Sequence, residues 1–200
     1  SKIEKERSTQ SLRRQSEFRV SLVGYTNVGK STLFKALTGS DVFIQDQLFA
    51  TLDTTVRKLN LDTSHTILLS DTVGFIRKLP HNLVASFKST LKEVLEADLI
   101  LMVLDMSSPQ VLDHMNTIQE VLEDMEADKI PTVMVLNKVD LISDGNMIEK
   151  IQRSFQEPVT VSAKQHLKLS ALSPKIIEHM EANYKTIDLE FPYEDGRTIA

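Results

Sequence analysis

The stretch GYTNVGKST, residues 24–32, decides the fold class of this chain. It begins where the apolar run FRVSLVG (18–24) ends and leads into TLFKAL (32–37), so a glycine-containing turn joins an expected strand to an expected helix. The spacing G-x-x-x-x-G-K-S is typical of a phosphate-binding loop, in which successive backbone N–H groups surround the phosphate oxygens. The expected binding residues are Gly24, Tyr25, Thr26, Asn27, Val28, Gly29, Lys30, Ser31 and Thr32. Among them, Lys30 is expected to reach the β and γ oxygens and the Ser31 hydroxyl to bind Mg²⁺.

Four further apolar runs follow the phosphate loop: HTILLSD (65–71), LILMVLD (99–105), TVMVLNK (132–138) and PVTVS (158–162). Amphipathic stretches separate most of them, which indicates an α/β fold of parallel strands joined by crossover helices. The segment TVRKLNLD (55–62) can pair antiparallel with 65–71 through the turn TSH, which makes the predicted sheet mixed. Most of these runs end in polar motifs, and ligands of open α/β sheets bind beyond the carboxyl ends of the strands.

Two apolar stripes at helical spacing predict helices that pack against the sheet. Their residues are Leu83, Phe87, Leu91, Val94 and Leu95, and then Val111, Met115, Ile118, Leu122 and Met125. The stretch LKLSALSPKIIEHMEANY predicts a last helix, which either starts near Ser173 as its cap or bends at Pro174, because proline lacks the N–H that a helix interior needs.

The composition limits the class of protein to which this chain can belong. The 200 residues are 41% apolar and 26% charged, which fits one ordinary globular domain. A net charge of −5 argues against a broadly basic nucleic-acid binder, and the lack of cysteine excludes disulfides and is compatible with the cytoplasm. No apolar run is long enough for a membrane helix, so we expect a soluble protein without a membrane partner. The predicted organisation is a basic tail or linker at 1–17, a domain at 18–186 and a C-terminal extension at 187–200, with a nucleic-acid-binding arm as the alternative for the tail.

The motif DTVG (71–74) ends the second of the parallel runs. At that edge of the sheet, the Asp71 carboxylate can hold Mg²⁺ through water and the Gly74 amide can contact a γ-phosphate. An aspartate before a threonine is by itself a common turn or helix cap, and its position after a phosphate loop favours the metal role.

The motif NKVD (137–140) predicts which base is bound. Guanine presents an N1–H and an exocyclic amine that the Asp140 carboxylate can accept together, whereas adenine presents a lone pair at that edge. Two charge-assisted hydrogen bonds, at about 1.5–3 kcal/mol each, discriminate between the bases by roughly 10² to 10⁴-fold. Asn137 is expected on the carbonyl side of guanine, bracing the phosphate loop, and the stem of Lys138 over the ring. The motif SAK adds Ser162, Ala163 and Lys164, with the Ala163 amide as a candidate contact to guanine O6.

A threonine in a loop can report the γ-phosphate by adding an oxygen ligand to Mg²⁺. The segment QLFATLDTTVRK offers Thr51, Thr54 and Thr55, and Thr51 is the preferred candidate. Threonines before a strand also serve as caps and as strand formers.

Taken in order, GYTNVGKS, a threonine loop, DTVG, NKVD and SAK resemble the signatures of the translation-factor-related P-loop GTPases. GYTNVGKSTLFKALTG, LFATLDTT and DTVGFIRKLPHNLVASFKSTLKEV resemble HflX, a family of ribosome-associated GTPases. The resemblance implies a Ras-like G domain with a six-stranded, mostly parallel mixed sheet and helices on both faces. It also implies GTP and GDP as ligands, Mg²⁺ as cofactor, and a cytoplasmic monomer that binds the large ribosomal subunit, with ribosomal RNA as a further candidate partner.

Several positions depart from that family or add to it. HflX proteins usually have LDPT in the threonine loop, where this chain has Leu52-Asp53-Thr54-Thr55, and often have glycines after SA, where this chain has KQHLKLSAL. They also have an N-terminal domain and a helical linker, so the chain resembles an excised G domain. Asn27 matches the asparagine of several potassium-activated GTPases, and a plain turn residue is the alternative.

Phe75 stands where Ras has the glutamine that orients the attacking water. A phenyl ring cannot hydrogen-bond to water, so we expect slow GTP hydrolysis that a ribosomal partner accelerates, with Lys30, Thr51 and Gly74 as the catalytic candidates. Arg77 and Lys78 are candidates for the partner contact. Two other functions stay open: a guanine-nucleotide-dependent docking module with negligible turnover, and an ATPase, which would require Asp140 to tolerate adenine.

Overall fold

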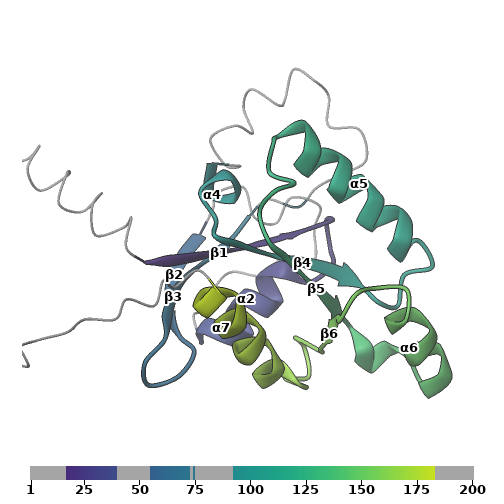
Figure 1. Ribbon diagram of the computed structural model, residues 1–200. Helices are drawn as coiled ribbons and strands as arrows, with labels where there is room; N and C mark the ends of the chain where they lie inside the picture. The colour runs from purple at the N-terminus through teal and green to yellow at the C-terminus, as the bar shows by residue number, and fades with distance from the viewer. Residues whose placement is uncertain (1–16, 40–54, 73, 75–91, 183–200) are drawn as a thin grey trace, which may run out of the picture.

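The computed structural model describes residues 17–39, 55–72, 74 and 92–182. These residues form one α/β unit with a central sheet (Figure 1). Its strands are β1 (Phe18–Gly24), β2 (Thr55–Asn60), β3 (Thr66–Asp71), β4 (Leu99–Asp105), β5 (Thr132–Asn137) and β6 (Val159–Thr160). Its helices are α2 (Lys30–Thr38), α4 (Lys92–Leu95), α5 (Val111–Asp124), α6 (Gly145–Gln152) and α7 (Leu172–Ala182), with short 3-10 helices at Val139–Leu141 and Leu169–Ala171.

The six strands lie in the order β2-β3-β1-β4-β5-β6. All neighbouring pairs are parallel except β2 and β3, which form an antiparallel hairpin. The order reverses at β1, because the chain proceeds to β3 on one side of it and to β4 on the other. A crevice opens beyond the carboxyl ends of the strands at such a reversal, and that is where open α/β sheets bind their ligands. The phosphate-loop sequence begins at the last residue of β1.

Alternating side chains of β4 divide the core into two layers. Leu99, Leu101 and Val103 belong to a cluster that α2 and α7 cover. Ile100, Met102 and Leu104 belong to a second cluster that α4 and α5 cover from the opposite face of the sheet (Figure 1). A strand with both faces buried lacks the alternation of apolar and polar residues, which explains why LILMVLD is apolar nearly throughout.

The structure confirms the predicted α/β class, the mixed sheet and the hairpin. Asp62 closes the turn of the hairpin by accepting hydrogen bonds at Oδ1 from the backbone N–H groups of Ser64 and His65, both at 2.7 Å. The fifth predicted run, 158–162, is a strand only at Val159–Thr160, because the chain then turns to pair Ser162 with Leu167.

Two details of the predicted helices are wrong. Leu95, expected on a buried stripe, is 50% exposed, while its neighbour Val94 is fully buried. Ser173 is not the cap of the last helix, since α7 begins at Leu172 and continues without a break through Pro174. A 3-10 turn precedes α7. Because α7 begins at Leu172, Pro174 lies in the first helical turn, where its missing N–H costs no intrahelical bond.

Candidate nucleotide site

The phosphate loop is shaped by two residues with left-handed backbone conformation. Asn27 has a φ of 63° and Gly29, which caps the N-terminus of α2, has a φ of 94°. A side chain at 29 would also collide, because its Cβ would lie 2.5 Å from Asn137 Nδ2. The loop therefore requires glycine at that position for two independent reasons. The amide groups that follow it lie at the start of a helix, where unpaired N–H groups favour anions.

Lys30, the first residue of α2, is buried at the base of this loop with 6% of its surface exposed. Its ammonium group donates to the backbone carbonyls of Gly24 and Tyr25, each at 3.2 Å. Burial lowers the pKa of Lys30 to about 8, and the nearby Asp71 carboxylate opposes part of that effect. Lys30 is thus a desolvated cation whose charge is costly in the absence of an anion, which prepares it for a phosphate group.

Asp71 ends β3 and Gly74 follows shortly after it, and both lie close to Lys30. Asp71 is fully buried, and its Oδ1 atom accepts no hydrogen bond from the described part of the chain. A Cβ placed on Gly74 would lie 2.9 Å from Thr26 Cα and 3.0 Å from Lys30 Nζ. The backbone at 74 therefore approaches the loop so closely that only a hydrogen atom fits there.

The two described residues that are predicted to bind Mg²⁺, Ser31 and Asp71, both carry oxygen ligands. Ser31 supplies a hydroxyl and Asp71 a carboxylate, and hard oxygen ligands of this kind bind Mg²⁺ in proteins together with substrate phosphates. The described residues contain no cluster of three or more histidine and carboxylate side chains that would hold a metal alone. A magnesium ion bound here would take further oxygen ligands from substrate phosphates and from water.

Asn137, at the end of β5, connects the phosphate loop to the segment that follows β6. Its Nδ2 donates to the carbonyl of Val28 at 2.9 Å, and its Oδ1 accepts from the N–H of Ala163 at 3.0 Å. The side chain is 2% exposed. The predicted bracing role of Asn137 is confirmed. The predicted contact of the Ala163 amide with guanine O6 stays a prediction, because this amide already donates to Asn137 and would have to be shared or released.

One cavity of about 570 Å³ joins the two ends of the predicted site. Phosphate-loop and base-motif residues line it together: Asn27, Gly29, Thr32, Asn137, Lys138, Asp140, Leu141, Ala163 and Lys164. Its volume is in the range of ligand pockets in proteins. Lys30 does not line the cavity but lies buried beneath the loop that does. Asp140 is exposed, so its carboxylate is accessible to a base that enters.

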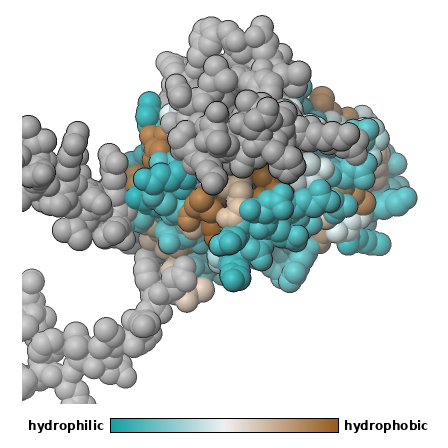
Figure 2. Space-filling view, turned by 90° about the horizontal axis from the view of Figure 1, so that it is seen from above, coloured by the Kyte–Doolittle hydropathy of each residue, from teal (hydrophilic) through white to brown (hydrophobic). Residues whose placement is uncertain are grey.

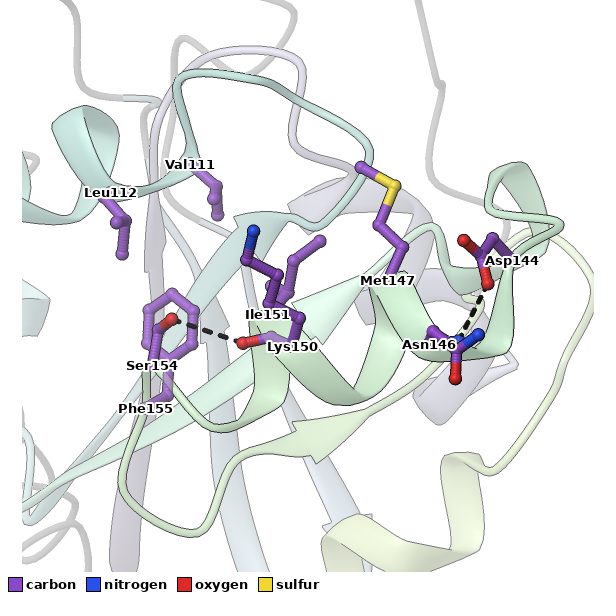
Figure 3. A pocket seen from close by; sticks show the side chains of 9 residues that line it. All are labelled: Val111, Leu112, Asp144, Asn146, Met147, Lys150, Ile151, Ser154 and Phe155. Carbon is purple, nitrogen blue, oxygen red and sulfur yellow. Dashed lines mark hydrogen bonds between the residues drawn. The ribbon is translucent and has the colours of Figure 1, made fainter.

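A second cavity, of about 550 Å³, lies between α5 and α6 (Figure 3). Its lining is mainly apolar, with Val111, Leu112, Met147, Ile151 and Phe155. Figure 3 shows these side chains around the groove. Because it contains no phosphate-loop or base-motif residue, we do not assign the nucleotide to it.

Some predicted residues lie outside the described residues. They are Thr51 and Thr54 of the threonine loop, Phe75, Arg77 and Lys78 after DTVG, and Leu83, Phe87 and Leu91 of the first apolar stripe. The predicted tail, except residue 17, and the predicted C-terminal extension also lie outside them. Thr55 is described, as the first residue of β2, and it pairs with Asp71 in the hairpin register. The choice of Thr51 as the γ-phosphate sensor therefore stays a prediction.

Two contacts near the site were not predicted. Asp105, at the end of β4, forms an ion pair with Lys138, with 2.8 Å between Oδ2 and Nζ. The ring of Tyr25 stacks on His114 of α5, with the ring centroids 4.3 Å apart and an interplanar angle of 10°. The sequence did contain a signal that Asp105 lies near the site, because it ends an apolar run as Asp71 and Asn137 do. Nothing in the sequence indicated that His114 would meet Tyr25.

The surface of the described residues is largely hydrophilic in the view of Figure 2, with apolar residues gathered in limited areas. The large apolar side chains that are exposed come from different elements: Leu95, Leu112, Leu141, Met147 and Leu167. Among the described helices, none has the length and apolar character that spanning a bilayer requires.

Comparison with known proteins agrees with this geometry. A family profile described as 50S ribosome-binding GTPase matches residues 19–138. The GTPase HflX of Caldanaerobacter subterraneus is 43% identical over 197 residues, which cover 98% of this chain and 45% of that protein. The GTPase HflX of Flavobacterium psychrophilum is 56% identical over 159 residues, covering 76% of this chain and 38% of that one. The chain thus spans less than half the length of these relatives.

Solved structures share the architecture. A crystal structure of Era in complex with MgGDPNP and nucleotides 1506–1542 of 16S ribosomal RNA superposes with a TM-score of 0.66 at 25% identity. The match covers 88% of this chain and 60% of the Era chain. The six-stranded mixed sheet is therefore that of the Ras-like P-loop GTPases.

Proposed function

Because this chain belongs to the 50S ribosome-binding GTPase family and, within it, to the HflX GTPases, we propose that it binds GTP, hydrolyses it to GDP and phosphate, and acts as a switch on the large ribosomal subunit. The observation that carries the proposal is that one cavity is lined by both Gly29 and Asp140, with Asn137 hydrogen-bonded to the phosphate loop and to the Ala163 amide. A ligand that fills it has an anionic end and a guanine end.

Different residues would contribute different chemical roles in this proposal. The loop amides and the Lys30 ammonium would neutralise charge on the β and γ phosphates in a desolvated environment, where electrostatic stabilisation is strong. Ser31 and Asp71 would hold Mg²⁺, which supplies further neutralisation of the phosphate charge when bound. Gly74 would contact the γ-phosphate through its amide, and Thr51 is the proposed γ-phosphate sensor. A potassium ion beside Asn27 belongs to the same proposal.

Guanine recognition is assigned to Asp140 and Lys138. Lys138 Nζ donates to the carbonyl of Asn27 at 2.8 Å, so its stem runs along the cavity from the base motif to the phosphate loop. Its methylene groups provide an apolar surface for a purine ring. The exposed Asp140 carboxylate accepts from the N1–H and the amine of guanine, which adenine cannot satisfy.

The proposal includes slow turnover by the chain alone, since Phe75 offers no hydrogen bond to the attacking water. A partner that supplies a missing electrostatic element in trans can raise the rate by about 10³ to 10⁵-fold. The partner proposed is the large ribosomal subunit, with ribosomal RNA as part of the contact, and the protein is proposed to act as a monomer in the cytoplasm. The domain boundaries 18–186 belong to the same proposal.

Single-turnover hydrolysis of γ-labelled GTP tests these points. We expect slow phosphate release from the wild-type chain, faster release with purified 50S subunits, no acceleration with 30S subunits, and loss of release in Lys30→Ala. A rate that is equally fast with and without 50S subunits would contradict the role of the partner. Nucleotide binding with no phosphate release under any condition would favour the docking module, which binds GTP without turning it over.

A further inference from the structure

The ion pair between Asp105 and Lys138 links three segments that are distant in sequence. Asp105 ends β4 and lies opposite Asn137 in the parallel register of β4 and β5. Its Oδ2 is 2.8 Å from Lys138 Nζ. The same ammonium group donates to the carbonyl of Asn27, also at 2.8 Å. One cation therefore joins the end of β4, the base motif and the phosphate loop.

Asp105 is itself held in one orientation by its neighbour Ser107. The backbone N–H of Ser107 donates to Asp105 Oδ1 at 3.0 Å, and the Ser107 hydroxyl donates to the same atom at 2.6 Å. Both bonds go to Oδ1, which leaves Oδ2 directed to Lys138. The carboxylate is thus anchored locally before it contacts the lysine, so little further ordering is required to form the pair.

Lys138 needs such an anchor. A lysine side chain has four flexible bonds and loses up to about 2 kcal/mol of rotamer entropy when it is fixed. Its backbone has a φ of 65°, so the chain turns sharply at this residue. The side chains of Lys138 and Asp105 are 26% and 17% exposed, so water screens their attraction only in part. Fixing the ammonium at both Asp105 and Asn27 extends the methylene stem along the cavity.

We propose that Asp105 is a positioning residue for guanine-nucleotide binding, acting through Lys138. It does not line the cavity, so its effect on the ligand is indirect. Asp105 holds the lysine stem where a purine ring packs against it, and it keeps the Asn27 carbonyl engaged, so that base binding and phosphate-loop geometry are coupled. This inference rests on the proposed nucleotide-binding function.

The test is a double-mutant cycle on binding of GDP and IDP, measured by competition with a fluorescent guanine nucleotide. Asp105→Asn keeps the shape of the side chain and removes its charge, and we expect it to weaken both ligands roughly tenfold, the scale of a hydrogen bond to a charged group. IDP differs from GDP only in lacking the exocyclic amine from which Asp140 would accept a hydrogen bond. Asp105→Asn should therefore leave the ratio of GDP affinity to IDP affinity unchanged. In a Lys138→Ala background, Asp105→Asn should have no further effect.

The matched control is Glu157→Gln, which removes the carboxylate of another close ion pair, with 2.7 Å between Glu157 Oε2 and Lys175 Nζ, away from the cavity. It should leave GDP affinity unchanged. Asp105→Asn with wild-type affinity, or with the same loss in the Lys138→Ala background, would overturn the positioning role and leave nucleotide binding intact. A wild-type chain that binds neither GDP nor GTP would instead contradict the proposed function itself.

Discussion

At single positions of this site, backbone conformation and loss of hydration determine what each residue contributes. Gly29 combines a φ of 94° with a close approach to the Asn137 amide. Lys30 is a buried cation whose charge is stabilised only in part by Asp71. Such features destabilise an empty site, and under the proposed function a bound phosphate group would relieve the cost.

Because burial lowers the pKa of Lys30 to about 8, we expect nucleotide binding to depend on pH. In the empty chain Lys30 loses its proton above about pH 8, whereas a bound phosphate keeps it charged. GDP affinity should therefore fall between pH 8 and 9, approaching about tenfold per pH unit. Calorimetry in buffers of different ionisation enthalpy should show uptake of roughly half a proton at pH 8.

The pH dependence of folding stability has the opposite sign to the pH dependence of GDP affinity. Because the folded pKa lies below that of the unfolded chain, the unfolded state binds more protons between about pH 8 and 10.5, and the contribution of Lys30 to stability rises with pH in that window. For the calorimetry of GDP binding, Lys30→Met removes the titrating group and serves as the control. If GDP binding to Lys30→Met took up as many protons at pH 8 as binding to the wild type, the assignment of the uptake to Lys30 would be contradicted.

At the scale of elements, the site depends on how closely β1 approaches β4. Gly24, the last residue of β1, pairs with Val103 of β4. A Cβ at Gly24 would lie 2.5 Å from the Val103 carbonyl oxygen and 2.9 Å from Val28 Cγ2. The strand end and the first turn of the loop are thus in contact through a glycine.

Gly24→Ala should destabilise the chain by about 1–3 kcal/mol, the cost of overpacking a core, since a backbone atom cannot move aside as a flexible side chain does. Urea unfolding measures this. The matched control is Gly145→Ala at the start of α6, where a Cβ meets nothing within 4 Å and alanine is the better helix former. The control should be neutral or slightly stabilising, and equal destabilisation of both variants would contradict the packing argument.

At the scale of the whole molecule, the nucleotide would join halves of the sheet that are far apart in sequence. The cavity takes residues from the β1–α2 loop, from the end of β5 and from the segment after β6. Asn137 already connects these parts through Val28 and Ala163. A ligand that binds only the folded arrangement stabilises all of it together.

Thermal unfolding with GDP and with ADP tests that expectation. At a GDP concentration of about 100 times the Kd, the stabilisation is about 2.7 kcal/mol, which raises the Tm by roughly 5–10 °C for a chain of this size. ADP should produce no comparable shift, because its adenine opposes the Asp140 carboxylate. Equal shifts with GDP and ADP would favour the ATPase alternative.

The sequence by itself determined the order of elements, the mixed sheet, the phosphate loop and the residues at the strand ends. These depend on local periodicity, on glycine and proline conformations and on motif spacing, all of which are properties of short segments. The departures concern single positions: Leu95 is exposed, and α7 begins at Leu172, directly after a 3-10 turn.

Only the tertiary structure decided which strand-end residues meet. The contacts of Asn137 with Val28, of Lys138 with Asn27, and of Lys138 with Asp105 depend on the registers of β1, β4 and β5. The first two span 109 and 111 residues of sequence. Register is set by the packing of both faces of the sheet at once, which no single segment contains.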